Sequence, residues 1–212
     1  MLRVALAAVC AGLTLTSCSV SLTAPDREPV NADAPESTVD LERLRVAEEV
    51  DDGSYERKAF GSSWKDVDDN GCDTRNDILA RDLVEVEKRD DCVVLSGVLK
   101  DDPYGDGSID FTRSRPTEIQ IDHVYPLALA WRMGASKWDK ARREEFANDP
   151  RNLLAVGGRA NQRKGDSGPE EWQPPQDFRC DYASRFTRVA LAYDLPVTAG
   201  AEDGLATMLK SC

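Results

Sequence analysis

The pattern of apolar and polar positions divides the chain into an apolar start, a polar stretch and a longer mixed region. Residues 4–15 form an almost unbroken apolar run, whereas residues 19–53 are rich in Ser, Thr, Pro, Asp and Glu. Such a polar stretch cannot bury enough apolar surface to offset its ordering entropy. Residues 19–53 are therefore predicted to form a flexible tether, with a short helix around 41–50 as an alternative there. The folded domain is predicted to begin near Tyr55 and to cover residues 54–212.

Two periodicities alternate within this domain and predict an α+β fold. Helical spacing predicts helices at 77–87, with Thr74 as N-cap, and at 127–133, 137–147, 160–163, 184–193 and 202–209. Strand-like runs at 92–99 and 109–112 flank a stretch dense in turn residues at 101–107, which predicts a hairpin. Two further strands are expected at 118–124 and 152–156, and the chain has no internal repeats.

The apolar start has the features of an export signal. Arg3 precedes the apolar run, which is too short to span a bilayer as a mature helix. The run ends in Leu15-Thr16-Ser17-Cys18, which resembles a bacterial lipobox, in which the cysteine is acylated. Residues 1–18 are therefore predicted to be a lipoprotein signal peptide, with an ordinary signal peptide cut elsewhere as the alternative. A lipid on Cys18 would anchor the protein to the outer side of the cell membrane.

Four cysteines remain after removal of the signal peptide, namely Cys72, Cys92, Cys180 and Cys212. An even number of cysteines in an oxidising compartment predicts two disulfides. Three pairings are open, and Cys72–Cys92 with Cys180–Cys212 is favoured because each bond closes a short local loop. None of the four cysteines has CxxC spacing, so a structural zinc site is not expected.

The net charge of −12 is unevenly distributed along the chain. Residues 26–112 carry 25 acidic and 11 basic side chains, whereas residues 113–188 carry 14 basic and 11 acidic ones. This balance does not support strong non-specific duplex binding through a broad basic face. It leaves room for a small basic groove in the second half of the domain.

Three short motifs lie within residues 118–166: Asp122-His123, Asn152-Leu-Leu and Asn161-Gln-Arg-Lys-Gly-Asp. Their order and the nine-residue gap from Asn152 to Asn161 resemble the HNH nuclease family, also called the ββα-metal or His-metal finger family. The resemblance extends over roughly residues 55–212, through the stretches 60–64, 72–79, 102–104 and 146–150 and Trp172. It implies a ββα-metal core with an added N-terminal hairpin and helix and C-terminal helices, held by disulfides.

The chemistry of phosphodiester hydrolysis accounts for these residue types. His123, the only histidine in the chain, has a suitable ordinary pKa to accept a proton from water. Asp122 and Asn161 offer two hard oxygen ligands, which suits Mg²⁺, or Mn²⁺ as an alternative, better than zinc or nickel. The resemblance implies that Asn152 orients the loop after His123 through its side-chain amide. It also implies products with a 3′-hydroxyl and a 5′-phosphate.

Two basic residues are candidates for contact with the phosphate. Arg75 could clamp the scissile phosphate, or could form a surface salt bridge with Asp73 or Asp77. Lys164 could also contact phosphate, or could be a solvated helix residue.

A second motif resembles a calcium-binding loop. Asp66, Asp68 and Asn70 occupy its first positions and Asp77 its twelfth, where the usual glutamate is missing. The alternative is a solvated acidic turn held in place by Cys72.

Together these patterns predict a metal-dependent endonuclease outside the cytoplasmic membrane. It is expected to cleave DNA, or RNA, with low sequence specificity, because no recognition module is evident. The alternative is a catalytically inactive HNH-fold binding protein of the cell envelope that binds calcium. The tryptophans are expected to be core anchors and not a base-stacking platform: Trp64, Trp131, Trp138 and Trp172.

Overall fold

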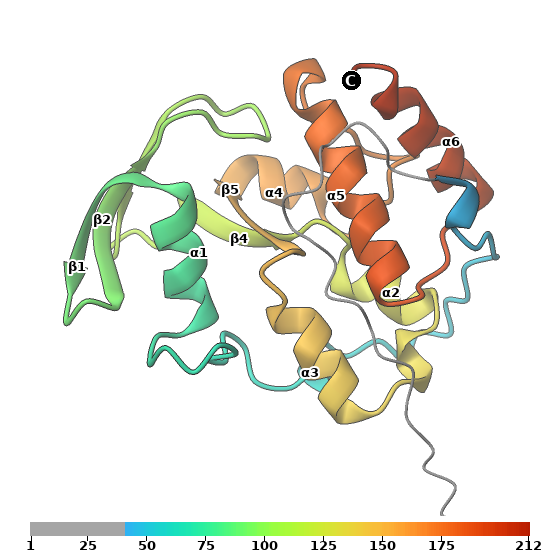
Figure 1. The fold of residues 1–212 in the computed structure, drawn as a ribbon, viewed down its shortest axis with the longest axis horizontal. Helices are drawn as coiled ribbons and strands as arrows, with labels where there is room; N and C mark the ends of the chain where they lie inside the picture. The colour runs from blue at the N-terminus through green and yellow to red at the C-terminus, as the bar shows by residue number, and fades with distance from the viewer. Residues whose placement is uncertain (1–40) are drawn as a thin grey trace, which may run out of the picture. The chain divides into compact units, whose positions relative to one another are not determined.

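The computed structural model describes residues 41–212 (Figure 1). The predicted signal peptide, the lipidated Cys18 and residues 19–40 of the predicted tether lie outside the described residues. The predicted α+β class is confirmed, since the described part contains five strands and six α-helices. No helix within residues 41–212 is both long and apolar enough to cross a membrane.

A three-stranded antiparallel sheet forms the N-terminal half, in the order β1 (Val84–Arg89), β2 (Val93–Leu99) and β3 (Ile109–Thr112). Helix α1 (Thr74–Asp82) packs against β2 and against the second sheet. The helix predicted at 77–87 was wrong at both ends. Asp73 is the N-cap, accepting a hydrogen bond from the Asn76 amide at 2.8 Å. Beyond Asp82 the sequence Val-Glu-Val-Glu alternates with strand periodicity and forms β1.

The second sheet is an antiparallel pair, β4 (Ile119–His123) with β5 (Leu153–Gly157), and α4 (Gly158–Lys164) follows β5 directly. Both faces of this pair are covered by apolar clusters. Ile121 and Ala155, which pair in register, belong to the cluster beneath α1 and the first sheet. Leu154 and Val156 belong to the larger cluster formed with the C-terminal helices. This double burial explains why β5 is a continuous apolar run without alternation.

The remaining helices are α2 (Leu127–Arg132), α3 (Lys140–Asn148), α5 (Arg179–Ala192) and α6 (Ala199–Leu209). Short 3-10 turns lie at Leu41–Arg43, Arg57–Phe60, Ala135–Lys137 and Gln176–Phe178. The helix predicted at 137–147 is interrupted, because Trp138 is extended and Asp139 caps α3 through the Arg142 amide. Figure 1 shows the first sheet and α1 on one side of β4 and β5, with α5 and α6 on the other.

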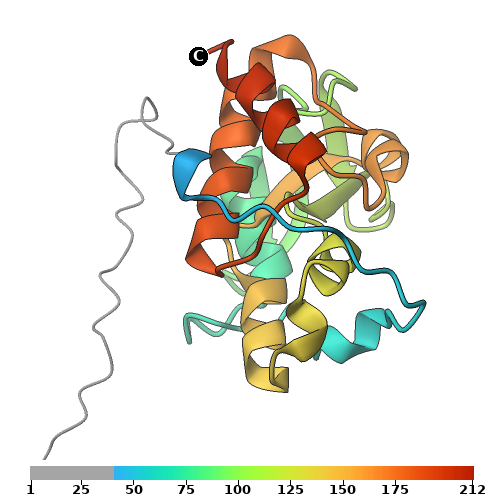
Figure 2. The same ribbon diagram turned by 90° about the vertical axis from the view of Figure 1, so that its right-hand side faces the viewer.

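Residues 41–53, predicted as part of the tether, lie along the domain in an extended segment. Val46 forms a parallel bridge with Val197, and the Ala47 amide donates to the Val197 carbonyl at 3.0 Å. Leu44 is buried, and Glu49 forms an ion pair with Arg132. Figure 2 shows this segment crossing beside α6. The folded part therefore starts before Tyr55, and only Leu41–Arg43 of the alternative helix at 41–50 is helical.

The two favoured disulfides, Cys72–Cys92 and Cys180–Cys212, are both present. Cys72–Cys92 joins the loop before α1 to the turn between β1 and β2. Cys180–Cys212 joins the start of α5 to the C-terminal residue.

Candidate active site

His123 ends strand β4, and its ring is fixed by one hydrogen bond. Its Nε2 lies 2.8 Å from the backbone carbonyl oxygen of Ala147, at the end of α3. A carbonyl oxygen can only accept, so Nε2 carries the hydrogen and Nδ1 keeps its lone pair. The side chain is almost fully buried, and this burial lowers the pKa of His123 to about 3. The imidazole is therefore neutral at pH 7, with one nitrogen able to accept a proton.

Asp122 lies on the opposite face of β4, toward α4. Its Oδ1 and Oδ2 lie 3.2 and 3.0 Å from the Nζ of Lys164, and its Oδ2 accepts a 2.6 Å hydrogen bond from the Tyr104 hydroxyl. Burial raises the pKa of Asp122 above its ordinary value, against the opposing effect of Lys164 and Tyr104. A carboxylate has about four lone-pair positions. These contacts engage both oxygens, Oδ2 twice and Oδ1 once.

Tyr104 reaches Asp122 because the loop between β2 and β3 docks on the end of β5. The buried Asp102 organises this loop by accepting hydrogen bonds from the amides of Gly157, Tyr104 and Asp106. Burial, together with Asp122, raises the pKa of Tyr104 well above 10, so its hydroxyl remains a donor. Tyr104 was not predicted from the sequence to act in the site, and its only signal there was its place in the stretch 102–104.

Asn152 immediately precedes β5 and is fully buried. Its Oδ1 accepts from the Tyr125 amide at 2.8 Å, and its Nδ2 donates to the Tyr125 carbonyl at 3.1 Å. The Val124 amide donates to the Asn152 carbonyl at 2.8 Å. Asn152 thus holds the two residues that follow His123, where the sequence prediction expected it to act.

Asp122, His123 and Asn161 line one open cleft of about 520 Å³. Asn161 comes from α4, and its Nδ2 donates to the Gln120 side chain at 2.9 Å. Its Oδ1 accepts no hydrogen bond from the described residues and is free to act as a ligand. The rest of the lining comes from the segment 51–57, from β4, from α2 and its N-cap, and from the turn after α4: Asp51, Tyr55, Arg57, Ile121, Pro126, Leu127, Ala128, Arg132, Gly165 and Asp166.

Arg75 and Lys164, both predicted to contact phosphate, already have partners within the protein. The Lys164 side chain is fully buried against Asp122, and its Nζ also donates to the His123 carbonyl at 3.0 Å. It is neither a solvated helix residue nor exposed toward a phosphate. The Arg75 guanidinium donates to the carbonyls of Pro116 and Ile119 at 3.1 and 3.2 Å, and not to the acidic neighbours proposed as its alternative partners.

Arg57 is a basic residue of the cleft that sequence reasoning missed, because no motif marked it. It is exposed, lines the main cleft beside His123, and forms no ion pair within residues 41–212. Arg132, the other arginine of the cleft, is neutralised by Glu49 and by Asp166 at 2.6 Å. Arg57 is thus the available cation at this opening.

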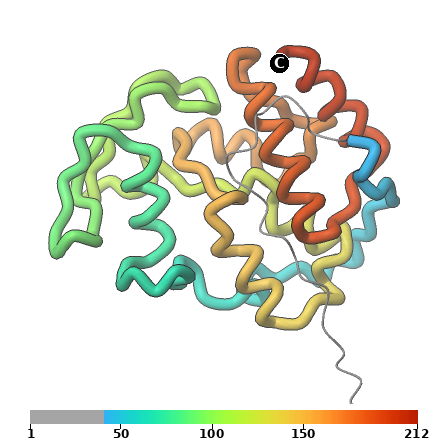
Figure 3. The backbone as a smooth tube through the Cα atoms, in the orientation of Figure 1, coloured from blue at the N-terminus to red at the C-terminus, as the bar shows by residue number. Residues whose placement is uncertain are grey.

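Trp64 lies on the other side of His123 and has a strained backbone, with φ at +59°. Its ring is nearly parallel to the imidazole at a centroid separation of 6.4 Å, and the Arg75 guanidinium lies 6.0 Å from its centroid. A space of about 20 Å³ is lined by Trp64, His123 and Arg57, and it is large enough for one water molecule. Figure 3 follows the chain from the segment that carries Arg57, past α3, to α1. Trp64 therefore packs beside the histidine as well as against the cluster under α1, whereas the other three tryptophans pack on the larger cluster.

The calcium-like loop is held by its own hydrogen bonds. Asn70 donates to Asp68 and to Asp77 at 3.1 and 3.2 Å, and the Gly71 amide donates to Asp66 at 2.9 Å. No group of three or more His, Cys, Asp or Glu side chains in residues 41–212 is arranged to hold a metal ion. Calcium binding by this loop stays a prediction.

The fold and the cleft define a disulfide-linked α+β domain with a neutral histidine, a carboxylate and a free amide oxygen in one opening. A family model described as "GmrSD restriction endonucleases, C-terminal domain" matches residues 73–208, more than half of the chain, and the chain belongs to this family. The match supports the nuclease family inferred from the motifs. The chain is also 38% identical over 175 residues to an "Uncharacterized secreted protein" of Arthroderma benhamiae, covering 81% of this chain and 82% of that protein. No solved structure matches the chain significantly.

Proposed function

We propose that the protein is a metal-dependent endonuclease of the HNH type, with β4, β5 and α4 as its ββα core. The observation that carries the proposal is the His123 ring, whose Nε2 is held by Ala147 in the same cleft as Asp122 and Asn161. Membership of a restriction endonuclease family supports the same reaction class.

In this mechanism His123 Nδ1 takes a proton from the attacking water. The hydrogen bond to Ala147 fixes the tautomer, and the cleft that His123 shares with Asp122 and Asn161 offers the position for the nucleophile. A base with a pKa near 3 is weak at pH 7. The negative charge of a phosphate bound in the cleft would stabilise the imidazolium and so raise this pKa toward the working range.

The residues fit a weakly held Mg²⁺, with Mn²⁺ as the alternative. Asp122 Oδ1, the less engaged of the two carboxylate oxygens, and the free Asn161 Oδ1 would provide two hard oxygen ligands, and Mg²⁺ takes its other ligands from water and phosphate. The cation would neutralise charge on the phosphate and on the leaving oxygen. Lys164 partly neutralises Asp122 and should weaken the affinity of this site for a divalent cation.

Arg57 supplies the phosphate contact in this proposal, in place of Arg75 and Lys164. Its guanidinium forms no ion pair within residues 41–212 and can form a two-point contact with phosphate oxygens. The substrate is proposed to be DNA in preference to RNA, cleaved with low sequence specificity to leave a 3′-hydroxyl and a 5′-phosphate.

The enzyme is proposed to act outside the cytoplasmic membrane, anchored by a lipid on Cys18. The two disulfides favour an oxidising compartment, and the similar protein of Arthroderma benhamiae is called secreted. Metabolic labelling with a radioactive fatty acid tests the anchor. Wild type should take up label and Cys18→Ser should not, and an unlabelled wild type would contradict the anchor without affecting the nuclease proposal.

The nuclease proposal is tested by nicking of supercoiled plasmid by the full chain, with Mg²⁺, Mn²⁺ or a chelator. His123→Ala and Asn161→Ala should abolish metal-dependent nicking. Lys58→Ala, next to Arg57 but paired with Glu56, should retain it. Failure of wild type with every metal and with single-stranded DNA and RNA would overturn the proposal.

One observation favours the second candidate, an inactive envelope-binding protein with the same fold. The buried pair of Lys164 and Asp122 already satisfies most of the carboxylate without a metal. An inert wild type that still binds oligonucleotides would support this second function.

A further inference from the structure

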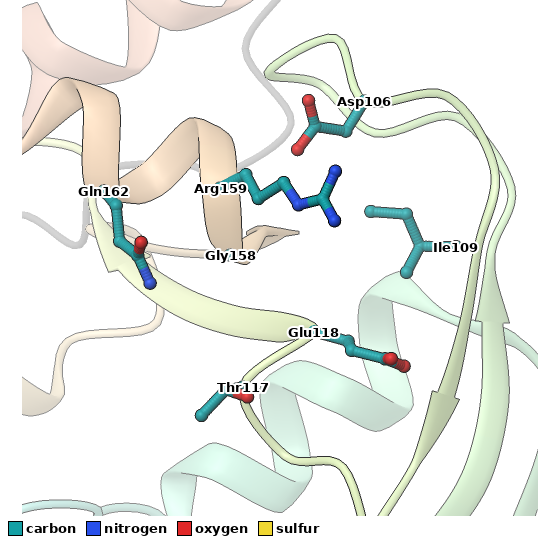
Figure 4. Close-up of a pocket in the computed structure, with 7 residues that line it drawn as sticks. All are labelled: Asp106, Ile109, Thr117, Glu118, Gly158, Arg159 and Gln162. Carbon is teal, nitrogen blue, oxygen red and sulfur yellow. The ribbon is translucent and has the colours of Figure 1, made fainter.

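A second cavity lies on the outer side of α4, with a volume of about 460 Å³ (Figure 4). The loop between β2 and β3, the start of β4 and the outer face of α4 surround it: Asp106, Ile109, Thr117, Glu118, Gly158, Arg159 and Gln162. In Figure 4 the Arg159 guanidinium extends into this space between Asp106 and Ile109. None of these residues has a role in the proposed chemistry.

Charge within the cavity favours an anion, although two of its residues are acidic. Asp106 is paired with Arg163 at 3.2 Å, and Glu118 is paired with Arg115 at 2.6 Å. Each carboxylate therefore has its own arginine. Arg159 forms no ion pair or hydrogen bond with any other side chain in residues 41–212, so among the side chains that line the cavity its charge is the uncompensated one.

The cavity adjoins the cleft through a short chain of contacts. Gln120 accepts from Asn161 at 2.9 Å and donates to the Thr117 carbonyl at 3.5 Å. Asn161 lines the cleft, and the next residue, Gln162, lines the cavity. Arg159 lies one helical turn before Gln162 and projects from the same side of α4. A strand of nucleic acid that crosses α4 can therefore occupy the cleft and the cavity together.

We propose that this cavity is a nucleotide subsite for single-stranded nucleic acid, next to the scissile phosphate. The Arg159 guanidinium binds a backbone phosphate, and Gln162 and Thr117 offer hydrogen bonds to a base edge. The Ile109 side chain provides an apolar contact for the base. The inference rests on the proposed function for the identity of its ligand.

The test is binding of a fluorescein-labelled ten-nucleotide single strand of mixed sequence, followed by fluorescence anisotropy in chelator. Arg159→Ala should raise Kd by roughly tenfold and lower the slope of log K against log salt by about 0.7, the effect of one lost phosphate contact. Arg159→Lys should give an intermediate Kd, because it keeps the charge but loses the planar fork. Arg89→Ala is the matched control, since it removes the same charge from an exposed site at the end of β1.

Equal Kd values and salt slopes for Arg159→Ala and Arg89→Ala would overturn the subsite. Because binding is measured without turnover, this result is separate from the nicking assay. A chain that nicks DNA but shows no Arg159 effect would retain the nuclease function and lose the subsite. An inert chain with the predicted Arg159 effect would retain the subsite and lose the nuclease function.

Discussion

Replacing Asn152 with alanine should destabilise the domain strongly, because its amide is the sole side-chain partner of the Tyr125 backbone. The variant leaves the Tyr125 N–H and C=O without their bonds of 2.8 and 3.1 Å at a position with no solvent access. Each buried polar group left unpaired costs about 1–3 kcal/mol, so the free energy of unfolding should fall by roughly 2–6 kcal/mol. At about 2–4 °C per kcal/mol for a domain of this size, Tm should fall by roughly 5–20 °C.

The measurement is urea unfolding of the disulfide-bonded protein, followed by near-ultraviolet circular dichroism. Asn152→Asp should also destabilise, because it keeps the acceptor for the Tyr125 N–H but turns a carboxylate oxygen toward the Tyr125 carbonyl. Asn70→Ala is the control, since Asn70 is exposed and water can replace its hydrogen bonds. A free energy for Asn152→Ala within 1 kcal/mol of wild type would refute the reasoning that this amide holds the turn after the histidine.

Three further perturbations probe other features of the domain. Lys164→Met should lower the free energy of unfolding by about 3–5 kcal/mol, because it leaves the buried Asp122 carboxylate without its counter-charge. Adding Asp122→Asn should recover part of that loss in a double-mutant cycle, whereas additive losses measured by urea unfolding would disprove the coupling. Replacing both Cys180 and Cys212 by serine should lower the free energy of unfolding by roughly 3–4 kcal/mol, because the loop of 32 residues is then no longer closed in the unfolded chain. An unchanged urea midpoint would contradict this expectation. The Arg132 guanidinium donates to Asp166 and holds the pKa of this carboxyl below its ordinary value of 3.8. The unfolded chain therefore binds more protons at low pH, and the stability that this pair contributes is lost as pH falls through that ordinary value and below it. Since Asp166 is largely exposed, its replacement by asparagine should flatten the acid side of a stability–pH curve by less than about 1 kcal/mol, and a curve unchanged in shape would exclude the contribution.

Local patterns predicted the elements that carry the site. The alternation of Ile119 and Ile121, the apolar run after Asn152 and the two glycines after it were enough to anticipate β4, β5 and α4. The error at 83–87 arose because Val84 and Val86 fit both a helical and a strand period. Antiparallel pairing with β2 stabilises the strand, and this pairing depends on residues that lie outside 83–87.

Contacts between residues far apart in the chain could not be predicted from these local patterns. Lysine is usually exposed, and nothing near Lys164 indicates that Asp122, 42 residues earlier, would draw it into the interior. Arg57 and Trp64 come from a segment that composition placed at the margin of the fold, and they reach His123 only through tertiary packing. The segment 41–53 was predicted as a tether because its few apolar residues do not reveal that Leu44 joins the larger cluster and that Val46 pairs with Val197, between α5 and α6.

The positions of the disulfides bear on how this domain can be shortened. Each bond has one cysteine inside the segment 73–208 shared with the family, Cys92 or Cys180, and one just outside it, Cys72 or Cys212. Excision of the shared segment alone would create two unpaired thiols and would remove Arg57 and Trp64, which form a wall beside the histidine. The flanks are therefore covalently attached parts of the working unit, and expression of this protein should preserve both ends of the described chain.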